Sequence, residues 1–167
     1  MGIILLGYKY SGRKSKSGNT ILCSEQFTAG PSERTAQCEK RQGDVAGRRL
    51  TVVNTPGWYS KTPLNRTSEL IKQQIVLSAS LCRPGPHALL LVMPAGESLT
   101  ADQCKNIEDH VQLLGPTVWS HTMILFTSRG LLRDKSIEQY IEREGEVQRL
   151  VEKCGDRYHV LALQGPN

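Results

Sequence analysis

Short apolar runs alternate along this chain with longer segments of helical period, and this alternation constrains the fold more than any other feature. The apolar runs occupy residues 3–7, 49–54, 87–93, 121–127 and 158–163, and the helical segments occupy 17–23, 68–81, 100–114 and 136–153. Such an order is typical of a parallel sheet with crossover helices, and near-continuous apolarity indicates strands that are covered on both faces. We therefore predict a three-layer α/β fold.

Local signals refine this prediction. Residues 37–47 alternate in polarity and predict an edge strand, antiparallel to the next run, with a hairpin turn between Gly43 and Gly47. Thr100 is a candidate N-cap and Gly115 a helix stop, while Gly145 is a weak point within the last helix.

The size and composition of the chain suit one soluble domain. It has 167 residues, of which 38% are hydrophobic, so a single core can be built. No apolar run approaches the roughly 20 residues of a membrane span, and no charged region precedes the first apolar run as in a signal peptide. Leu6 stands where a myristoylation signal has Ser or Thr, so we reject lipidation at Gly2. We expect an intracellular, cytoplasmic protein without a transmembrane segment.

Cysteine, histidine and overall charge indicate no metal centre built from cysteine and histidine and no nucleic-acid partner. The five cysteines form no CxxC pair and no Cys/His cluster, so we expect reduced thiols, mostly in or near the core. The four histidines are far apart in the sequence, and none is proposed as catalytic. The net charge of +5 is modest, and its densest run, "GRKSKSG", lies inside one loop instead of forming a basic stripe.

That basic loop resembles a phosphate-binding loop with one residue too many. The pattern GxxxxGK[ST] would be met by Gly7, Gly12, Lys14 and Ser15 if Arg13 were deleted. Arg13 either replaces the final glycine or is inserted after Gly12. In both cases we expect the loop to bulge, because this turn normally needs close backbone approach.

The position of the loop supports a phosphate site. In an open parallel sheet, ligands lie beyond the carboxyl ends of the strands, and this loop follows the first strand and precedes a helix. In a working loop the Lys reaches the outer phosphates and the next hydroxyl binds Mg²⁺, which makes Lys14 and Ser15 the candidates, with Lys16 and Ser17 in the same run. The alternative is an ordinary Gly/Ser-rich turn with basic side chains.

A second motif ends the strand at 49–54. The sequence "TVVNTPGW" places Asn54 and Gly57 where a G domain has Asp-x-x-Gly. In that motif the Asp holds Mg²⁺ through water and the Gly N–H meets the terminal phosphate. Gly57 fits this pattern, but Asn54 lacks the charge.

Together these motifs resemble a known family of G proteins. The strings "SGNTIL", "TAQCEKRQGDVAGRRLTVV", "TPGW", "PGPHALLLVMPAG" followed by "LTADQ", "ILFT" and "VEKCGDRYHVL" cover nearly the whole chain in family order. They are similar to the immunity-associated GTPases, the IMAP or GIMAP family with its avirulence-induced-gene type of G domain, and especially to its expanded fish-like members. The resemblance implies a P-loop NTPase G domain over residues 1–167, shortened before the closing helix and C-terminal extension of full members.

The resemblance also implies roles for individual residues and partners. Lys14 resembles the phosphate-binding lysine and Ser15 the magnesium serine, while Thr35 resembles the switch threonine that senses magnesium and terminal phosphate, unless it is an ordinary loop residue. Gly57 resembles the second-switch glycine. The expected cofactors are GTP or GDP with Mg²⁺. Family members are similar to septin-like proteins that dimerise across the nucleotide face, so a homo- or heterodimer with a family member is expected, as is peripheral association with intracellular membranes.

Several positions depart from the family pattern. Gly130, in Ser128-Arg129-Gly130-Leu131, aligns with the Asp that binds the guanine edge, and losing such charged hydrogen bonds, each worth about 1.5–3 kcal/mol, weakens guanine preference. Ala162 and Leu163 replace an Asn pair near the base. Trp58 has no amide or carboxylate to orient an attacking water.

Three functions follow from these features. The first is a guanine-nucleotide-dependent switch with weak or absent intrinsic hydrolysis. The second is a pseudo-GTPase, an interaction module that no longer binds nucleotide. The third is a P-loop kinase or ATPase, which we rank last because the chain shows no separate acceptor-substrate site.

Overall fold

The computed structural model describes residues 1–9, 13–28, 37–82, 85–128 and 136–163. Its strands are β1 (Gly2–Gly7), β2 (Glu39–Val45), β3 (Arg48–Asn54), β4 (Ala88–Pro94), β5 (Thr122–Ser128) and β6 (Tyr158–Ala162). Its α-helices are α1 (Arg13–Leu22), α2 (Glu69–Ser78), α3 (Ala101–Val111), α4 (Ser136–Arg143) and α5 (Gly145–Lys153). Short 3₁₀ turns occupy Leu64–Arg66, Ala79–Leu81, Gln112–Leu114 and Val118–His121.

The described strands form one sheet in the order β2-β3-β1-β4-β5-β6, with β2 antiparallel to β3 and every other pair parallel. The predicted edge strand is therefore confirmed. The hairpin turns at Ala46 and Gly47, whose φ angles of 51° and 76° are those of a two-residue type I′ turn. Gly43, predicted to begin the turn, instead lies within β2 opposite Leu50.

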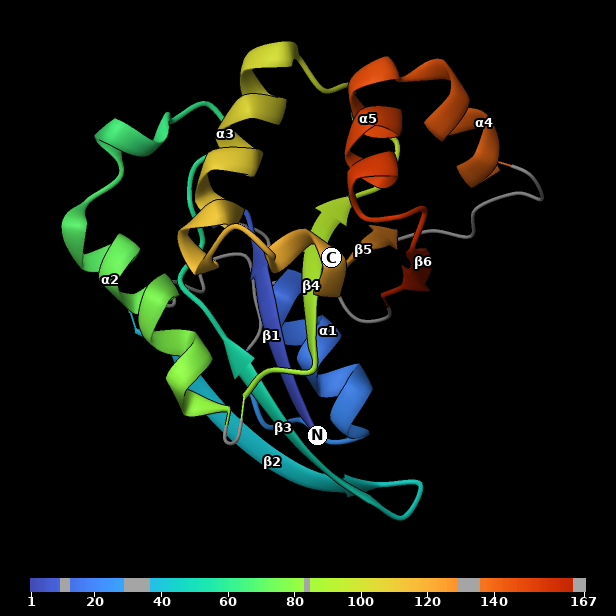
Figure 1. The fold of residues 1–167 in the computed structure, drawn as a ribbon. Helices are drawn as coiled ribbons and strands as arrows, with labels where there is room; N and C mark the ends of the chain where they lie inside the picture. Colours follow the sequence, from blue (N-terminus) through green and yellow to red (C-terminus); the bar gives the residue numbers. More distant parts are fainter. Residues whose placement is uncertain (10–12, 29–36, 83–84, 129–135, 164–167) are drawn as a thin grey trace.

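Helices cover both faces of this sheet (Figure 1), which confirms the three-layer α/β prediction. Alternate residues of β1 point to opposite faces, as the two-residue period of a strand requires. Leu5 packs with Leu22 of α1 on one face, whereas Ile4 and Leu6 pack with the residues of α2, α3 and α5 on the other. Because β1, β3, β4, β5 and β6 run parallel, their carboxyl ends all lie along the same side of the sheet, next to the start of α1.

Two helix predictions need correction. The first helix begins at Arg13 and not at Ser17, so Lys14 and Ser15 belong to its first turn. The segment 136–153 forms two helices, α4 and α5, because Glu144 adopts an extended backbone with φ −100° and ψ 97° immediately before Gly145. Thr100 does cap α3, where its hydroxyl and the Gln103 side chain form a capping box. Within the described ranges, no helix has both the length and the apolarity needed to span a bilayer.

Candidate functional site

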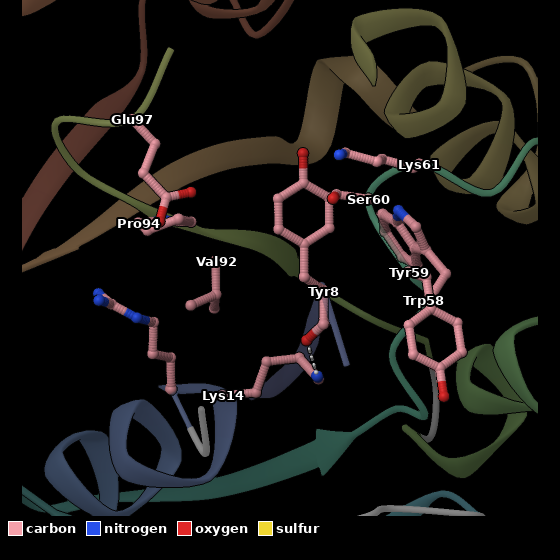
Figure 2. A pocket seen from close by; sticks show the side chains of 10 residues that line it. Tyr8, Lys14, Trp58, Tyr59, Ser60, Lys61, Val92, Pro94 and Glu97 are labelled. Carbon is pink, nitrogen blue, oxygen red and sulfur yellow. Dashed lines mark hydrogen bonds between the residues drawn. The ribbon is translucent and has the colours of Figure 1, made fainter. Parts of the chain in front are cut away.

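The carboxyl end of β1 leads into the candidate phosphate loop. β1 extends through Gly7, and Tyr8 forms an isolated parallel bridge with Trp58. Lys14 lies in the first turn of α1, is only 8% exposed, and donates from Nζ to the Tyr8 carbonyl oxygen over 2.8 Å (Figure 2). A lysine ammonium is almost never buried without acceptors, so this position fits a site where anions also reach it.

The length of the loop favours a replaced glycine over an inserted residue. In the strand–GxxxxGK[ST]–helix arrangement the first pattern position follows the strand and stands six residues before the lysine. Here Gly7 is the last strand residue, and Tyr8 stands six residues before Lys14. On this register Tyr8 occupies the first glycine position and Arg13 the second. Gly7 is required for packing, because a Cβ there would meet the Val92 carbonyl oxygen at 2.6 Å.

The end of β3 faces the start of α1. Asn54 and Ser15 are both fully buried, and Asn54 Nδ2 donates to Ser15 Oγ over 3.0 Å. Asn54 Oδ1 has no hydrogen-bond partner among the described residues, although it is buried. An unsatisfied buried amide oxygen costs about 1–3 kcal/mol, so it marks a place where a polar ligand or a water would be stabilised.

Gly57 brings the loop after β3 against the candidate phosphate loop. A Cβ on Gly57 would lie 2.5 Å from the backbone of Lys9, so only glycine permits this approach. Two backbone hydrogen bonds join the loops, from Lys9 N to Trp58 O at 2.9 Å and from Trp58 N to Gly7 O at 3.4 Å. The two predicted motifs are therefore in direct contact.

A cavity of about 510 Å³ opens at this junction (Figure 2). Its walls come from the candidate phosphate loop, the segment after β3 and the end of β4, and its lining residues are Tyr8, Arg13, Lys14, Trp58, Tyr59, Ser60, Lys61, Val92, Pro94 and Glu97. Three of these side chains are cationic and one is acidic, so the cavity favours an anion.

Two aromatic residues of this lining carry buried polar atoms. Neither Tyr8 Oη nor Trp58 Nε1 finds a hydrogen-bond partner in the part of the chain that the structure describes. Burial raises the pKa of Tyr8, so its hydroxyl stays protonated and able to donate. Trp58 is 2% exposed and stacks on His110 of α3, with ring centroids 4.6 Å apart.

Arg13 connects the start of α1 with the end of β5. Its Nη1 donates to the carbonyl oxygen of Thr127 over 2.9 Å and to Thr127 Oγ1 over 2.6 Å. Thr127 is fully buried, and its carbonyl oxygen also accepts from Ala95 N. The side chain that interrupts the sequence pattern thus spans from the phosphate loop to the strand on the far side of β4.

The remaining predicted residues divide into two groups. Lys16 is partly exposed, and the Ser17 hydroxyl donates to the Arg13 carbonyl oxygen within α1, over 2.7 Å. Gly12, Thr35 and Gly130 lie outside the described residues. The roles assigned to all of these positions stay predictions.

Sequence reasoning missed several residues of the site, namely Tyr8, Lys61, Glu97, His110 and Thr127. Tyr8 stands beside a glycine that already satisfied the pattern, and Lys61 and Glu97 belong to no motif. His110 and Thr127 reach the site only through tertiary contacts. The position of Thr127 directly before the predicted base segment was the one available signal.

The donor set fits magnesium only in part. Ser15 Oγ and the unpartnered Asn54 Oδ1 are neutral oxygens, of the hard type that Mg²⁺ prefers. Mg²⁺ is commonly held by one or two carboxylates together with substrate phosphates, and Asn54 provides no charge. These residues suit a magnesium ion that is held mainly by the phosphates of its ligand.

Comparison with known proteins connects this geometry to a family. A family model described as "AIG1 family" matches residues 1–164. The chain belongs to the AIG1 family. The match covers β1 through β6 and therefore every described residue of the candidate site.

Curated relatives share this region with low identity. "GTPase IMAP family member 8" of Rattus norvegicus is 29% identical over 157 residues, which is 93% of this chain and 22% of that protein. The Homo sapiens protein of the same name is 30% identical over 163 residues, 95% of this chain and 24% of that protein. "Immune-associated nucleotide-binding protein 12" of Arabidopsis thaliana is 28% identical, over 93% of this chain and 40% of that protein. The chain therefore spans less than half of the length of these relatives.

Solved structures agree on the fold. Toc33 from Arabidopsis thaliana, in complex with Mg²⁺ and GMPPNP, superposes with a TM-score of 0.73 at 14% identity, covering 99% of this chain and 71% of that one. Era, in complex with MgGDPNP and part of 16S ribosomal RNA, superposes with a TM-score of 0.66 at 14% identity, covering 96% and 50%. These similarities establish that the AIG1 chain has the fold of P-loop GTPases.

Proposed function

We propose that the chain is a GTP-binding G domain of the GIMAP type, a guanine-nucleotide-dependent switch with weak or absent intrinsic hydrolysis. The observation that carries this proposal is Lys14, which is buried in the first turn of α1 and lines an anion-favouring cavity at the carboxyl ends of β1 and β4. Ligands of open α/β sheets bind at this edge, and a helix N-terminus adds a favourable dipole for phosphate.

Family membership supports the same ligand. Relatives in two kingdoms carry names that describe a GTPase or a nucleotide-binding protein, and Toc33 was solved with GMPPNP and Mg²⁺. In this proposal Lys14 meets the outer phosphates, Ser15 lies next to Mg²⁺, and the backbone N–H of Gly57 approaches the terminal phosphate. Mg²⁺ would supply charge neutralisation on the phosphates. We also propose that Gly12, Lys16, Ser17 and Thr35 lie around this ligand, with Gly7 directly before the loop at the end of β1.

Weak hydrolysis follows from the residue after Gly57. Hydrolysis needs a side chain that orients a water in line with the terminal phosphate. Trp58 occupies the position after Gly57 and is held in the core by its stack on His110. An indole so fixed offers one N–H donor and no acceptor, so it cannot hold a water as a glutamine does.

Pairing with a second G domain would supply groups that the chain lacks. One solved structure with this fold is described as showing that dimerisation is important for the GTPase activity of the chloroplast translocon components atToc33 and psToc159. We include in the proposal a homo- or heterodimer with a family member across the nucleotide face.

Calorimetric titration with GTP and GDP tests the proposal. We expect Lys14→Ala to weaken binding by about 10-fold or more, since a charge-assisted hydrogen bond contributes about 1.5–3 kcal/mol. Lys105→Ala, which removes an equal charge from the exposed face of α3, should leave binding unchanged. If the folded wild-type chain binds neither nucleotide at high micromolar concentration, the proposal is wrong.

The second candidate is a pseudo-GTPase interaction module. It is favoured by Arg13, whose side chain reaches from the start of α1 to Thr127, and by the neutral Asn54 beside Ser15. The same titration distinguishes the two candidates, because magnesium-dependent binding or thermal stabilisation by nucleotide contradicts the second one.

A further inference from the structure

The cavity beside Lys14 and the carboxyl ends of β5 and β6, toward which a nucleotide would extend, differ in chemistry. The phosphate end has the cations Arg13, Lys14 and Lys61 around one cavity. At the other end, β6 finishes at Ala162 and is followed by the buried Leu163, and neither side chain has a hydrogen-bonding group. A base bound over β5 and β6 would therefore meet apolar side chains at β6, whereas a phosphate chain would meet several donors.

Arg13 lies along the path between these ends. In the sheet order β1-β4-β5-β6, a ligand that runs from the loop after β1 to the ends of β5 and β6 must cross β4. Arg13 begins at the start of α1, lines the cavity next to Val92 and Pro94 of β4, and reaches Thr127 of β5. A glycine at this position would remove the Arg13 side chain from that path.

The anchor of Arg13 is rigid. Thr127 is fully buried, its Oγ1 donates to the Met93 carbonyl oxygen over 3.3 Å, and its own carbonyl oxygen accepts from Ala95 N over 2.9 Å. Both oxygens of Thr127 that Arg13 reaches are thus fixed by β4 and the turn after it. Moving the guanidinium would break both hydrogen bonds to Thr127.

We propose that this site recognises its ligand through the polyphosphate chain alone, so that Arg13 makes binding largely independent of the base. This inference rests on the part of the proposed function that places a nucleoside triphosphate at Lys14, and it replaces selectivity for guanine with selectivity for the triphosphate group. It assigns the ligand to a chemical class: a triphosphate group, either esterified to any nucleoside or free.

The test compares GTP, ATP and inorganic tripolyphosphate by calorimetric titration of the full chain, with and without Mg²⁺. We expect the three dissociation constants to agree within about tenfold, which means that the base contributes less than about 1.4 kcal/mol to binding. GTP binding more than tenfold tighter than tripolyphosphate would overturn the inference and leave the proposed function standing. Failure of all three ligands to bind would overturn both.

Variants identify the residue responsible. Arg13→Ala removes a cationic side chain that all three ligands would meet. It opens the path toward β5 and β6 only for GTP and ATP, because tripolyphosphate has no base. We therefore expect the ratio of the tripolyphosphate to the GTP dissociation constant to rise at least about threefold. Arg49→Ala, an equal charge change at the exposed start of β3, should leave the ratio unchanged. An unchanged ratio in folded Arg13→Ala would contradict the role of Arg13, and the wild-type comparison decides the inference even if that variant does not fold.

Discussion

Asn54 and Ser15 show how one atom can change the chemistry of a site. An aspartate at position 54 would present two charged acceptors to a metal, whereas the asparagine presents one neutral oxygen and donates its N–H to Ser15 Oγ. The amide thereby occupies the hydroxyl that is predicted to bind Mg²⁺, and its own oxygen is left without a described partner. We infer that the side chains of the wild-type chain contribute little to holding magnesium, which would be bound mainly by the phosphates of the ligand.

Asn54→Asp should increase the dependence of GTP binding on magnesium. We expect the ratio of GTP dissociation constants without and with Mg²⁺ to increase about tenfold or more, because a charged oxygen replaces a neutral one. Without ligand, the free energy of unfolding should fall by roughly 1–3 kcal/mol, since the new carboxylate is buried. Calorimetry and thermal melts measure both effects. Asn65→Asp, at an exposed position, is the control, and a magnesium ratio equal to that of wild type would contradict the prediction.

At the scale of elements, α3 holds the segment that follows β3. His110 of α3 stacks on Trp58, and its Nε2 lies 2.6 Å from Thr67 Oγ1. Its Nδ1 lies 2.6 Å from the Asn106 carbonyl oxygen, and Asn106 Nδ2 donates to the Ser60 carbonyl oxygen over 3.3 Å. The segment between Trp58 and Thr67 is thus attached to one helix at several points.

His110→Ala should destabilise the protein by roughly 2–4 kcal/mol, the sum of a lost aromatic stack, two lost hydrogen bonds and a cavity. Denaturant unfolding followed by tryptophan fluorescence measures this change. His159→Ala on the exposed side of β6 should stay within about 0.5 kcal/mol of wild type. Equal stability of the two variants would show that His110 does not hold the segment.

Stability should also depend on pH through His110. Burial lowers the pKa of His110 below its ordinary value of 6.5, opposed by the Asn106 carbonyl oxygen and the nearby Asp109, while Lys72 of α2 acts in the same direction as burial. The folded state then keeps this ring neutral while the unfolded state binds a proton, so stability is complete above 6.5 and falls as the pH drops below it.

We expect the free energy of unfolding to change by at most about 1.4 kcal/mol per pH unit through this one group. Denaturation of wild type and His110→Asn at about pH 5.5 and about pH 7.5 isolates it, because the other histidines are shared by both proteins. The variant should lose less stability on acidification than wild type does. An equal loss would exclude His110 as the origin.

The elements also show what the sequence could predict. Apolar runs located the five strands other than β2 to within a residue at each end, since burial on both faces leaves a strong signal, whereas β2 was predicted from its alternating polarity over a range two residues too long at each end. The start of α1 was missed because Arg13, Lys14 and Ser15 carry no apolar period. The break at Glu144 lies directly before Gly145, the predicted weak point, but one continuous helix was predicted because the apolar period continues across it. Asn54 and Gly57 were found through local motifs, whereas His110 and Thr127 reach the site only through the packing of α3 and β5.

Across the whole molecule, four of the five thiols lie in or against the core on one face of the sheet. Cys82, Cys104 and Cys154 are buried in the core on the side of α2, α3 and α5, and Cys38 packs against it, while Cys23 at the end of α1 is exposed. The prediction of thiols mostly in or near the core is confirmed. Burial raises the pKa of Cys104 to about 12 and the pKa of Cys38 and Cys154 to about 11, and it also raises the pKa of Cys82.

These thiols provide a measure of global opening. Because the thiolate is the nucleophile, we expect a disulfide reagent at neutral pH to modify one thiol per folded chain rapidly, at Cys23, and all five in denaturant. Cys23→Ser should abolish the rapid phase without altering the slow one. The slow phase should follow unfolding, so a ligand that binds the folded state should slow it in proportion to its occupancy, as mass action requires. Rapid modification of several thiols in the folded chain would contradict a closed core, and a slow phase unaffected by a bound nucleotide would separate nucleotide binding from the stability of the sheet.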